Sequence, residues 1–186
     1  MNQGMGGYKL CSACNKQTGS DYARTYIDMA KAVTEGTLKL VYNGNIAHFS
    51  YTLHPLRFIK QVMSMHLSAD HSQGELREVL DSKSLFLNKE AADVPNQVRG
   101  YMYLSAPGST YRFNGIWVGG LAGQSVKISE VSFPPFGFVL SLDGAIKLEN
   151  MMDITGFFGY GYEEEEEVKF SLPLLKTIGP VTGLYG

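Results

Sequence analysis

Charge, cysteine and long apolar runs are all scarce in this 186-residue sequence. Sixteen Lys and Arg against 18 Asp and Glu give a formal net charge of −2, so no overall field draws the chain to nucleic acid or to an anionic membrane. Two cysteines are too few for a disulfide-stapled secreted scaffold. The longest apolar run, around residues 131–142, contains Pro134 and Pro135 and is too short to span a membrane. We therefore expect a soluble cytoplasmic protein with no membrane partner.

The length and the apolar content favour one domain with a well-packed core. Apolar residues make up 44% of the chain and charged residues 18%, which is typical of a globular protein. We expect a single domain over residues 1–186. Its parts would be a flexible glycine-rich tail at 1–10, a knuckle with a helical part at 11–81, and a sheet part at 98–175.

The first half of the sequence predicts helices and one hairpin. A helix capped by Ser20 or Asp21 would run to about Glu35 and end at Gly36. The next segments would be strands at 37–42 and 46–53 around the turn Asn43-Gly44. Pro55 fits the first turn of a second helix that ends near residue 68 and is apolar on most of its circumference, as a central core helix is. A short third helix is predicted at 73–80.

The second half changes to short runs rich in β-branched and aromatic residues, separated by turn residues. Partial alternation of apolar and polar residues is typical of half-buried antiparallel strands. We expect strands at 98–105, 111–118, 125–131, 137–142 and 166–172. Helices first and strands later predict an α+β fold with an antiparallel sheet.

The two cysteines, Cys11 and Cys14, are separated by two residues and followed by Asn15 and an expected turn at Thr18-Gly19. Such a pair supplies half of a tetrahedral zinc site. The missing ligands could come from His48 and His54, which are six residues apart on one strand-like segment and could share a face.

Two other sources of ligands stay open, and so does an interpretation without metal. His66 and His71 have a similar spacing. A second copy of the chain could also contribute its own cysteine pair to a four-thiolate site on a dimer axis. Without metal, the histidines would be packed or surface residues and the cysteines reduced thiols in a vestigial turn.

The segment Cys11-Ser12-Ala13-Cys14-Asn15-Lys16-Gln17-Thr18-Gly19 resembles the second zinc knuckle of HNH endonuclease-like proteins, including uncharacterised bacterial and phage proteins. In that family a Cys-x-x-Cys-Asn turn leads into a helix. The resemblance implies zinc at Cys11 and Cys14. Nuclease members also carry an upstream Cys-x-x-Cys and an acidic-His pair that supplies the general base. The ten residues before Cys11 contain no His, Cys, Asp or Glu, so nuclease activity is not implied, and we expect a remnant or truncated relative.

Two further groups of residues are candidate binding sites. Arg57 and Lys60 lie on one polar stripe of the core helix and could clamp a phosphate, as in a nucleotide-type ligand. The second group is a run of five carboxylates that could form an acidic patch for a basic partner or a solvated loop, namely Glu163, Glu164, Glu165, Glu166 and Glu167.

Taken together, these features predict a non-catalytic binding protein derived from an HNH-like family. A phage inhibitor of a bacterial defence system, acting on a protein or a nucleotide signal in the host cytoplasm, is the specific form of this hypothesis. One alternative is a metal-dependent HNH-type nuclease. Another is a structural or assembly protein that forms oligomers, of which a homodimer is the simplest.

Overall fold

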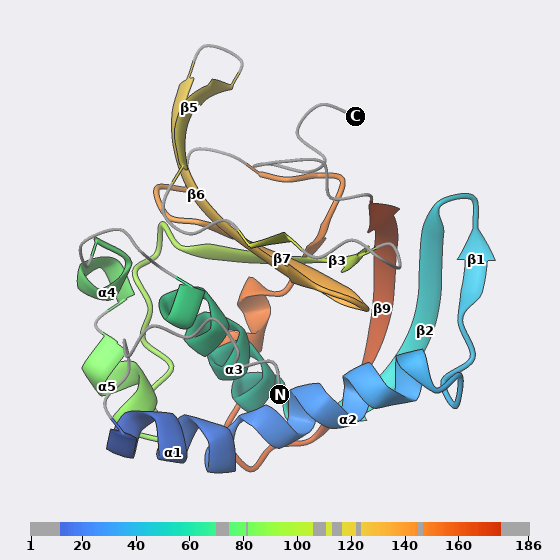
Figure 1. Ribbon diagram of the computed structural model, residues 1–186, viewed down its shortest axis with the longest axis horizontal. Coiled ribbons are helices and arrows are strands. Elements are labelled where there is room, and N and C mark those ends of the chain that lie inside the picture. Colours follow the sequence, from blue (N-terminus) through green and yellow to red (C-terminus); the bar gives the residue numbers. More distant parts are fainter. Residues whose placement is uncertain are drawn as a thin grey trace, which may run out of the picture.

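The structure is a computed structural model that describes residues 12–69, 75–80, 82–105, 111–112, 117–121, 124–144 and 147–175. Helices dominate the first half of the chain and strands the second (Figure 1). The helices are α1 (Ser12–Asp21), α2 (Ala23–Thr34), α3 (Pro55–Ala69), α4 (Glu75–Leu80), α5 (Ser82–Leu87) and the 3-10 helix η1 (Thr155–Gly159). The strands are β1 (Val41–Asn43), β2 (Ile46–Leu53), β3 (Arg99–Ser105), β4 (Tyr111–Arg112), β5 (Trp117–Leu121), β6 (Gln124–Phe133), β7 (Phe136–Ser141), β8 (Met152–Asp153) and β9 (Glu166–Leu175).

These nine strands form one sheet in the order β1-β2-β9-β3-β7-β6-β4, with β5 paired to β6 and β8 paired to β3. The described pairs are antiparallel except β3 and β9, which run parallel over Leu104–Leu174 and Ser105–Leu175. The predicted α+β fold with a mostly antiparallel sheet is confirmed. The hairpin of the first half is not separate from the second half, because β2 pairs along its whole length with β9.

The N-terminal helical region differs from the prediction. Thr18-Gly19, expected as a turn after the cysteine pair, is helical and belongs to α1. Helical structure is then interrupted at Tyr22, where φ is −122° and ψ is −33°. Tyr22 is fully buried, and its hydroxyl donates a hydrogen bond to the carbonyl oxygen of Phe86 at 3.0 Å. Tertiary packing thus overrides the weak helix propensity of Thr18-Gly19 and places the break at Tyr22.

Two turn and cap predictions are confirmed by the backbone, and a third is shifted by one residue. Gly36 follows the last turn of α2 with a φ of 69°, a conformation that glycine adopts without strain. The hairpin turn is present one residue later than predicted: its two residues are Gly44, with a φ of 59°, and Asn45, because Asn43 ends β1 and pairs with Ile46. Pro55 is the first residue of α3.

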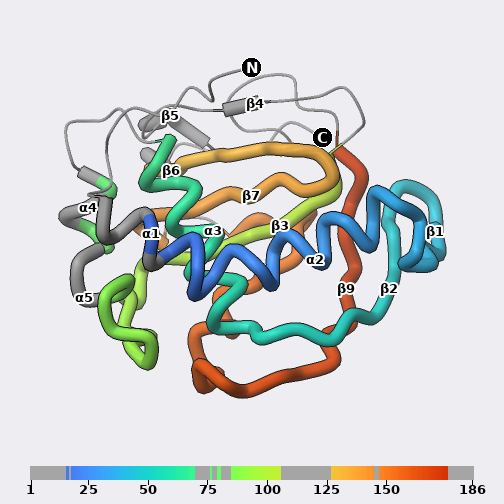
Figure 2. Tube along the Cα trace, turned by 60° about the horizontal axis from the view of Figure 1, so that its bottom comes forward, coloured from blue at the N-terminus to red at the C-terminus, as the bar shows by residue number. Residues whose placement is uncertain are grey.

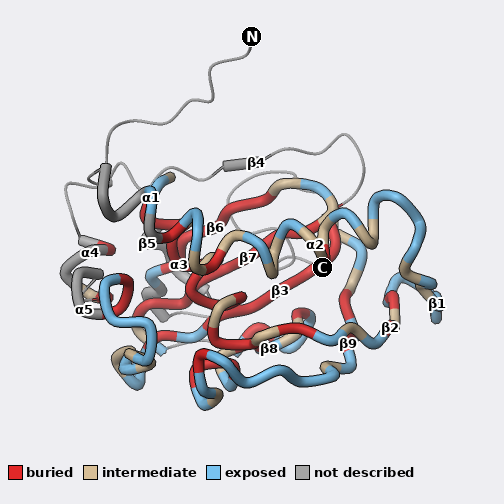
Figure 3. Tube along the Cα trace, turned by 90° about the horizontal axis from the view of Figure 1, so that it is seen from below, coloured by how far each residue is buried: buried red, intermediate tan, exposed pale blue. Residues whose placement is uncertain are grey.

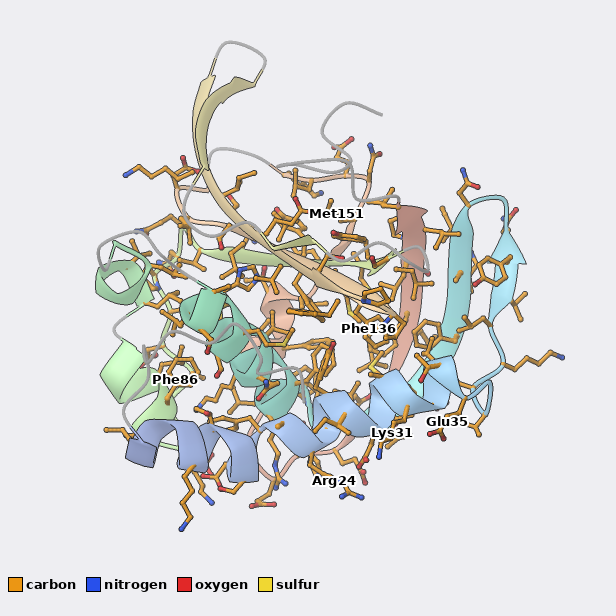
Figure 4. All side chains as sticks on the ribbon, viewed as in Figure 1. Arg24, Lys31, Glu35, Phe86, Phe136 and Met151 are labelled. Atoms are coloured by element: carbon orange, nitrogen blue, oxygen red, sulfur yellow. The ribbon has the colours of Figure 1, made fainter. Side chains whose placement is uncertain are left out.

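The main core lies between α3 and one face of the sheet. Figure 2 shows α2 and α3 on the same side of the central strands. Phe58 of α3 lies 6.0 Å from Phe138 of β7 and 6.1 Å from Phe157 of η1, measured between ring centroids. Phe136 points into the same layer (Figure 4). Figure 3 shows the resulting band of buried residues along α3, β3 and β7, as predicted for a central core helix.

A second, smaller cluster covers the opposite face of the sheet. Figure 4 labels one of its members, Met151, on the far side of the sheet from Phe136. The buried members of this cluster are Tyr101, Tyr103, Ile128, Val139, Leu148 and Met151. The central strands β3, β6 and β7 are therefore packed on both faces.

Candidate functional site

The cysteine pair cannot be placed as a metal site. Residues 1–11, including the expected tail and Cys11, and also His71, lie outside the described residues. Cys14 is part of α1, but its side chain is not among those described. Within the described part of the chain, no three His, Cys, Asp or Glu side chains come together as metal ligands. Zinc at Cys11 and Cys14 stays a prediction.

His48 and His54 share a face of β2 and its extension but do not come together. Six residues of extended strand separate their Cα atoms by about 20 Å. His48 Nδ1 lies 3.0 Å from the hydroxyl oxygen of Ser171, which is directly opposite on β9. His54 Nδ1 lies 3.0 Å from the carbonyl oxygen of Glu164. The two histidines are too far apart to bind one ion. His48 links β2 to β9, and His54 links the end of β2 to the loop before β9.

Arg57 contacts the acidic run directly. Its guanidinium stacks over the ring of Tyr162 at 4.2 Å, and its Nε donates a hydrogen bond to the Tyr162 carbonyl oxygen at 2.8 Å. Its Nη2 forms an ion pair with Glu163. Two candidate sites that are more than a hundred residues apart in sequence therefore form one contact. This contact ties the acidic run to the first turn of α3.

Lys60 is fully buried, although the sequence pattern places it on the polar stripe of α3. Its Nζ donates hydrogen bonds to the carbonyl oxygens of Asn88 at 2.9 Å and Lys89 at 2.7 Å, just beyond α5. Burial lowers the pKa of Lys60 to about 8, partly offset by the nearby Glu90 carboxylate. The ammonium has no exposed surface to offer a phosphate, so the proposed clamp with Arg57 is not formed.

We expect the free energy of unfolding to rise between pH 8 and pH 10. The folded pKa of Lys60 is about 8 against an ordinary 10.5, so in this window the unfolded chain binds the extra proton and raising the pH favours the fold. The expected gain is about 1 kcal/mol. Above pH 10 the sign reverses, because the pKa of Tyr22 and that of Tyr26 are raised by burial to about 12.

Urea unfolding at pH 8, 9 and 10 measures this gain, with Lys60→Met as the test variant and Lys31→Met, on the exposed side of α2, as the matched control. Figure 4 shows Lys31 pointing away from the sheet. The rise should vanish in Lys60→Met and persist in Lys31→Met. An equal rise in both variants would mean that another group titrates.

The acidic run is exposed along its whole length, and neighbouring residues fix its backbone. A side-chain oxygen of Glu164 accepts a hydrogen bond from the Gly161 amide at 2.9 Å. Glu166 and Glu167 begin β9, opposite Leu53 and Thr52. The run is thus a short loop followed by the start of a strand, and its carboxylates form an acidic surface on an ordered backbone.

His66 is a packed core residue, one of the alternatives left open for the histidines. It is fully buried, and its Nδ1 lies 2.9 Å from the hydroxyl oxygen of Ser129 on β6. Among the residues that the structure describes, its Nε2 has no hydrogen-bond partner. Burial lowers the pKa of His66 to about 3, so the imidazole is neutral near pH 7.

A buried polar contact on the other face was not anticipated from the sequence. The hydroxyl of Tyr103 donates a hydrogen bond to the carboxylate of Glu130 at 2.6 Å, and both side chains are buried. The Tyr103 ring lies across Gly137, the residue directly opposite on β7. Ser132 donates to Ser105 at 2.9 Å beside them. These contacts hold β3, β6 and β7 together beneath the smaller cluster.

The open edge of the sheet carries an unusual concentration of exposed apolar side chains. Val41 is 56% exposed, Tyr42 54% and Ile46 42%, whereas strand residues of this kind are usually covered. Leu174, 37% exposed, lies beside the turn, since its amide donates to the Asn45 carbonyl oxygen at 2.7 Å. Figure 3 shows β1 in the exposed colour at the margin of the molecule. The alternation of residues in the sequence gave no signal for this patch.

The backbone of Tyr42 faces outward from this edge. Asn43 and Ile46 flank the two-residue turn and form its closing hydrogen-bonded pair. Hydrogen-bonded pairs alternate with non-hydrogen-bonded pairs, so Tyr42 and Ala47 form a pair of the second kind. The Tyr42 N–H and C=O consequently point away from β2. Ile46 directs its N–H and C=O to Asn43, so its pair with Pro173 on β9 is not hydrogen-bonded. Pro173 has no N–H and therefore suits this position.

No helix in the described part of the chain combines the length and the apolar character needed to cross a membrane. Comparisons of this chain with protein-family models, with curated proteins and with solved structures found no match. The residues themselves therefore indicate the functional surface, and the surface that they indicate is the open edge formed by β1 and the β1–β2 turn.

Proposed function

We propose that this protein is a non-catalytic protein-binding module that acts through the open edge of its sheet. The observation that carries the proposal is the exposed, uncharged hairpin formed by β1, the turn and the start of β2. Residues 40–47 contain no Lys, Arg, Asp, Glu or Pro. Natural edge strands are usually protected from pairing by such residues, so an unprotected edge with exposed Val41 and Tyr42 favours the addition of a partner strand.

The acidic run offers a second contact surface, on the neighbouring strand β9 and at the opposite end of β2 from the β1–β2 turn. Glu166 and Glu167 lie on β9, two strands from the β1 edge. Exposed carboxylates of one sign speed the approach of a basic partner, while the apolar edge supplies the short-range contact. This arrangement is compatible with descent from an HNH-like family and with a phage inhibitor that binds a protein of a bacterial defence system, and we retain both as parts of the proposal.

Selection from a displayed random-peptide library against the purified protein tests the binding site. We expect enriched peptides with alternating apolar residues, because these suit strand addition. Tyr42→Pro removes the outward N–H and leaves the pairing with β2 intact, so it should weaken binding of these peptides about tenfold or more. Thr52→Ala, at an exposed position of β2 away from the edge, is the control. Peptides that bind wild type and Tyr42→Pro equally well would place the binding site elsewhere.

A nuclease assay tests the non-catalytic part of the proposal. The purified protein, incubated with plasmid DNA and with single-stranded RNA in Mg²⁺, Mn²⁺ or Zn²⁺, should leave both intact. Cleavage that is lost in a Cys14→Ser variant would overturn the proposal in favour of the metal-dependent nuclease.

A further inference from the structure

We infer that the occupant of the open edge is a second copy of this chain, paired β1 to β1 about a two-fold axis. The inference rests on the proposed function and names the partner at the edge, while the exposed acidic run stays available to a basic partner. Homo-oligomers most often form by such self-complementary contacts, in which the same patch is used by both subunits. The pairing would join the two nine-stranded sheets into one continuous sheet.

The backbone of β1 is self-complementary about Tyr42. In an antiparallel pair centred there, Tyr42 faces Tyr42 of the second copy, and Val41 faces Asn43. The outward N–H and C=O of the two Tyr42 residues then exchange two hydrogen bonds, which is the arrangement of a hydrogen-bonded antiparallel pair. The same contact covers Val41 and Tyr42, which are more than half exposed in one chain. No main-chain rearrangement of β1 is needed.

The charges around the edge also allow self-pairing. Lys39, the charged residue nearest to β1 in sequence, would face Asn45 of the second copy and not another lysine. Thr52, which opposes Glu167, is five residues from Ala47, the partner of Tyr42, or about 17 Å along the strand. A two-fold axis normal to the sheet sends the two acidic runs in opposite directions. Their separation exceeds the screening length of about 8 Å at physiological ionic strength, so like-charge repulsion does not oppose the dimer.

Light scattering on a size-exclusion column and sedimentation over a concentration series test this inference. We expect wild type to shift from monomer to dimer as the concentration rises to about 200 µM, because a single edge contact is small and gives micromolar affinity. Tyr42→Lys should raise the dissociation constant about tenfold or more, by adding a charge to each side of the contact. Thr52→Lys, the matched control on β2, should dimerise as wild type does.

Cross-linking gives a second, positional measurement. In a Cys11→Ser/Cys14→Ser background, Tyr42→Cys should form a disulfide-linked dimer under mild oxidation. Paired Cα atoms in a hydrogen-bonded antiparallel pair lie about 5.5 Å apart, within the range that a disulfide spans. Thr52→Cys, far from the axis, should stay monomeric on a reducing-agent-free gel.

The outcomes separate this inference from the proposed function. A wild-type chain that stays monomeric at every concentration would overturn self-pairing, whereas selected peptides that bind at Tyr42 would still support the binding module. A dimer unaffected by Tyr42→Lys would place the interface elsewhere and would also overturn the inference. If the chain is monomeric and no peptide depends on Tyr42, both proposals fail.

Discussion

A Gly137→Ala variant is expected to lose a large part of its stability. A Cβ atom added at Gly137 would lie 2.0 Å from Cζ and 2.4 Å from Cε2 of Tyr103, far inside van der Waals contact. The ring cannot move aside freely, because it is fully buried and its hydroxyl is bonded to the buried Glu130 carboxylate. Overpacking together with a broken buried hydrogen bond should cost about 4 kcal/mol, a large part of the stability of a typical domain.

Urea unfolding of four variants checks this expectation: Gly137→Ala, Tyr103→Leu, the two combined, and Gly159→Ala. Gly159→Ala is the matched control, since a Cβ there meets nothing within 4 Å. It should unfold close to wild type. Adding Tyr103→Leu to Gly137→Ala removes the ring and should recover part of the loss, so that the two substitutions together cost less than their sum. Additive losses would show that the Tyr103 ring is not the obstacle. If Gly137→Ala unfolds like wild type, the close packing of β3 on β7 is wrong.

Acid is expected to destabilise the protein through His66. Because burial lowers the folded pKa of His66 from 6.5 to about 3, the unfolded chain takes up a proton first as the pH falls below 6.5. The contribution to stability is therefore complete above pH 6.5 and declines progressively toward pH 3. Between pH 6.5 and pH 4 the loss should reach about 3 kcal/mol, at 1.36 kcal/mol for each pH unit.

The free energy of unfolding is measured by urea titration at pH 7, 6, 5 and 4 for wild type and two variants. The comparison separates the contribution of His66 from that of other titrating groups. His66→Gln removes the titrating group and should have a flatter pH profile than wild type, whatever its stability at pH 7. His48→Gln, at a half-buried histidine that makes a similar contact with a serine hydroxyl, is the comparison variant. Parallel profiles for all three proteins would assign the acid sensitivity to carboxylates.

Local signals in the sequence predicted local features of the fold well. Gly36, Gly44 and Pro55 each have a backbone preference that is independent of distant contacts, and each lies in or next to the turn or helix end that was expected, although the hairpin turn is shifted by one residue to Gly44-Asn45. The start of helical structure at Ser12 and the short strand β8 were missed. The break between α1 and α2 follows the buried packing of Tyr22, and β8 consists of two residues that pair with β3. Neither cause is visible in a local pattern.

The candidate sites depended more on contacts that are distant in sequence. Lys60 lies on a polar stripe by helical spacing, yet its environment is set by the carbonyl oxygens of residues 88 and 89. Likewise, the spacing of His48 and His54 predicted that they share a face of the strand. The extended strand places their Cα atoms too far apart for both side chains to bind one ion. The exposure of Val41 and Tyr42 depends on what packs beside β1, and the order of the strands decides this. Residue type and spacing could propose partners for these side chains, but only the topology could select among them.

The place of β9 between β2 and β3 has a consequence for how the chain folds. His48 and Ser171, joined by a hydrogen bond, are 123 residues apart in sequence. The β1–β2 hairpin can form early, but its partner strand leaves the ribosome only after the helices and the other strands have been made. Pairing over such separations slows folding, and strands left unpaired meanwhile are prone to aggregate. Without β9, the strand order leaves two separate sheets, β1–β2 on one side and the strands from β3 to β4 on the other, which β9 joins.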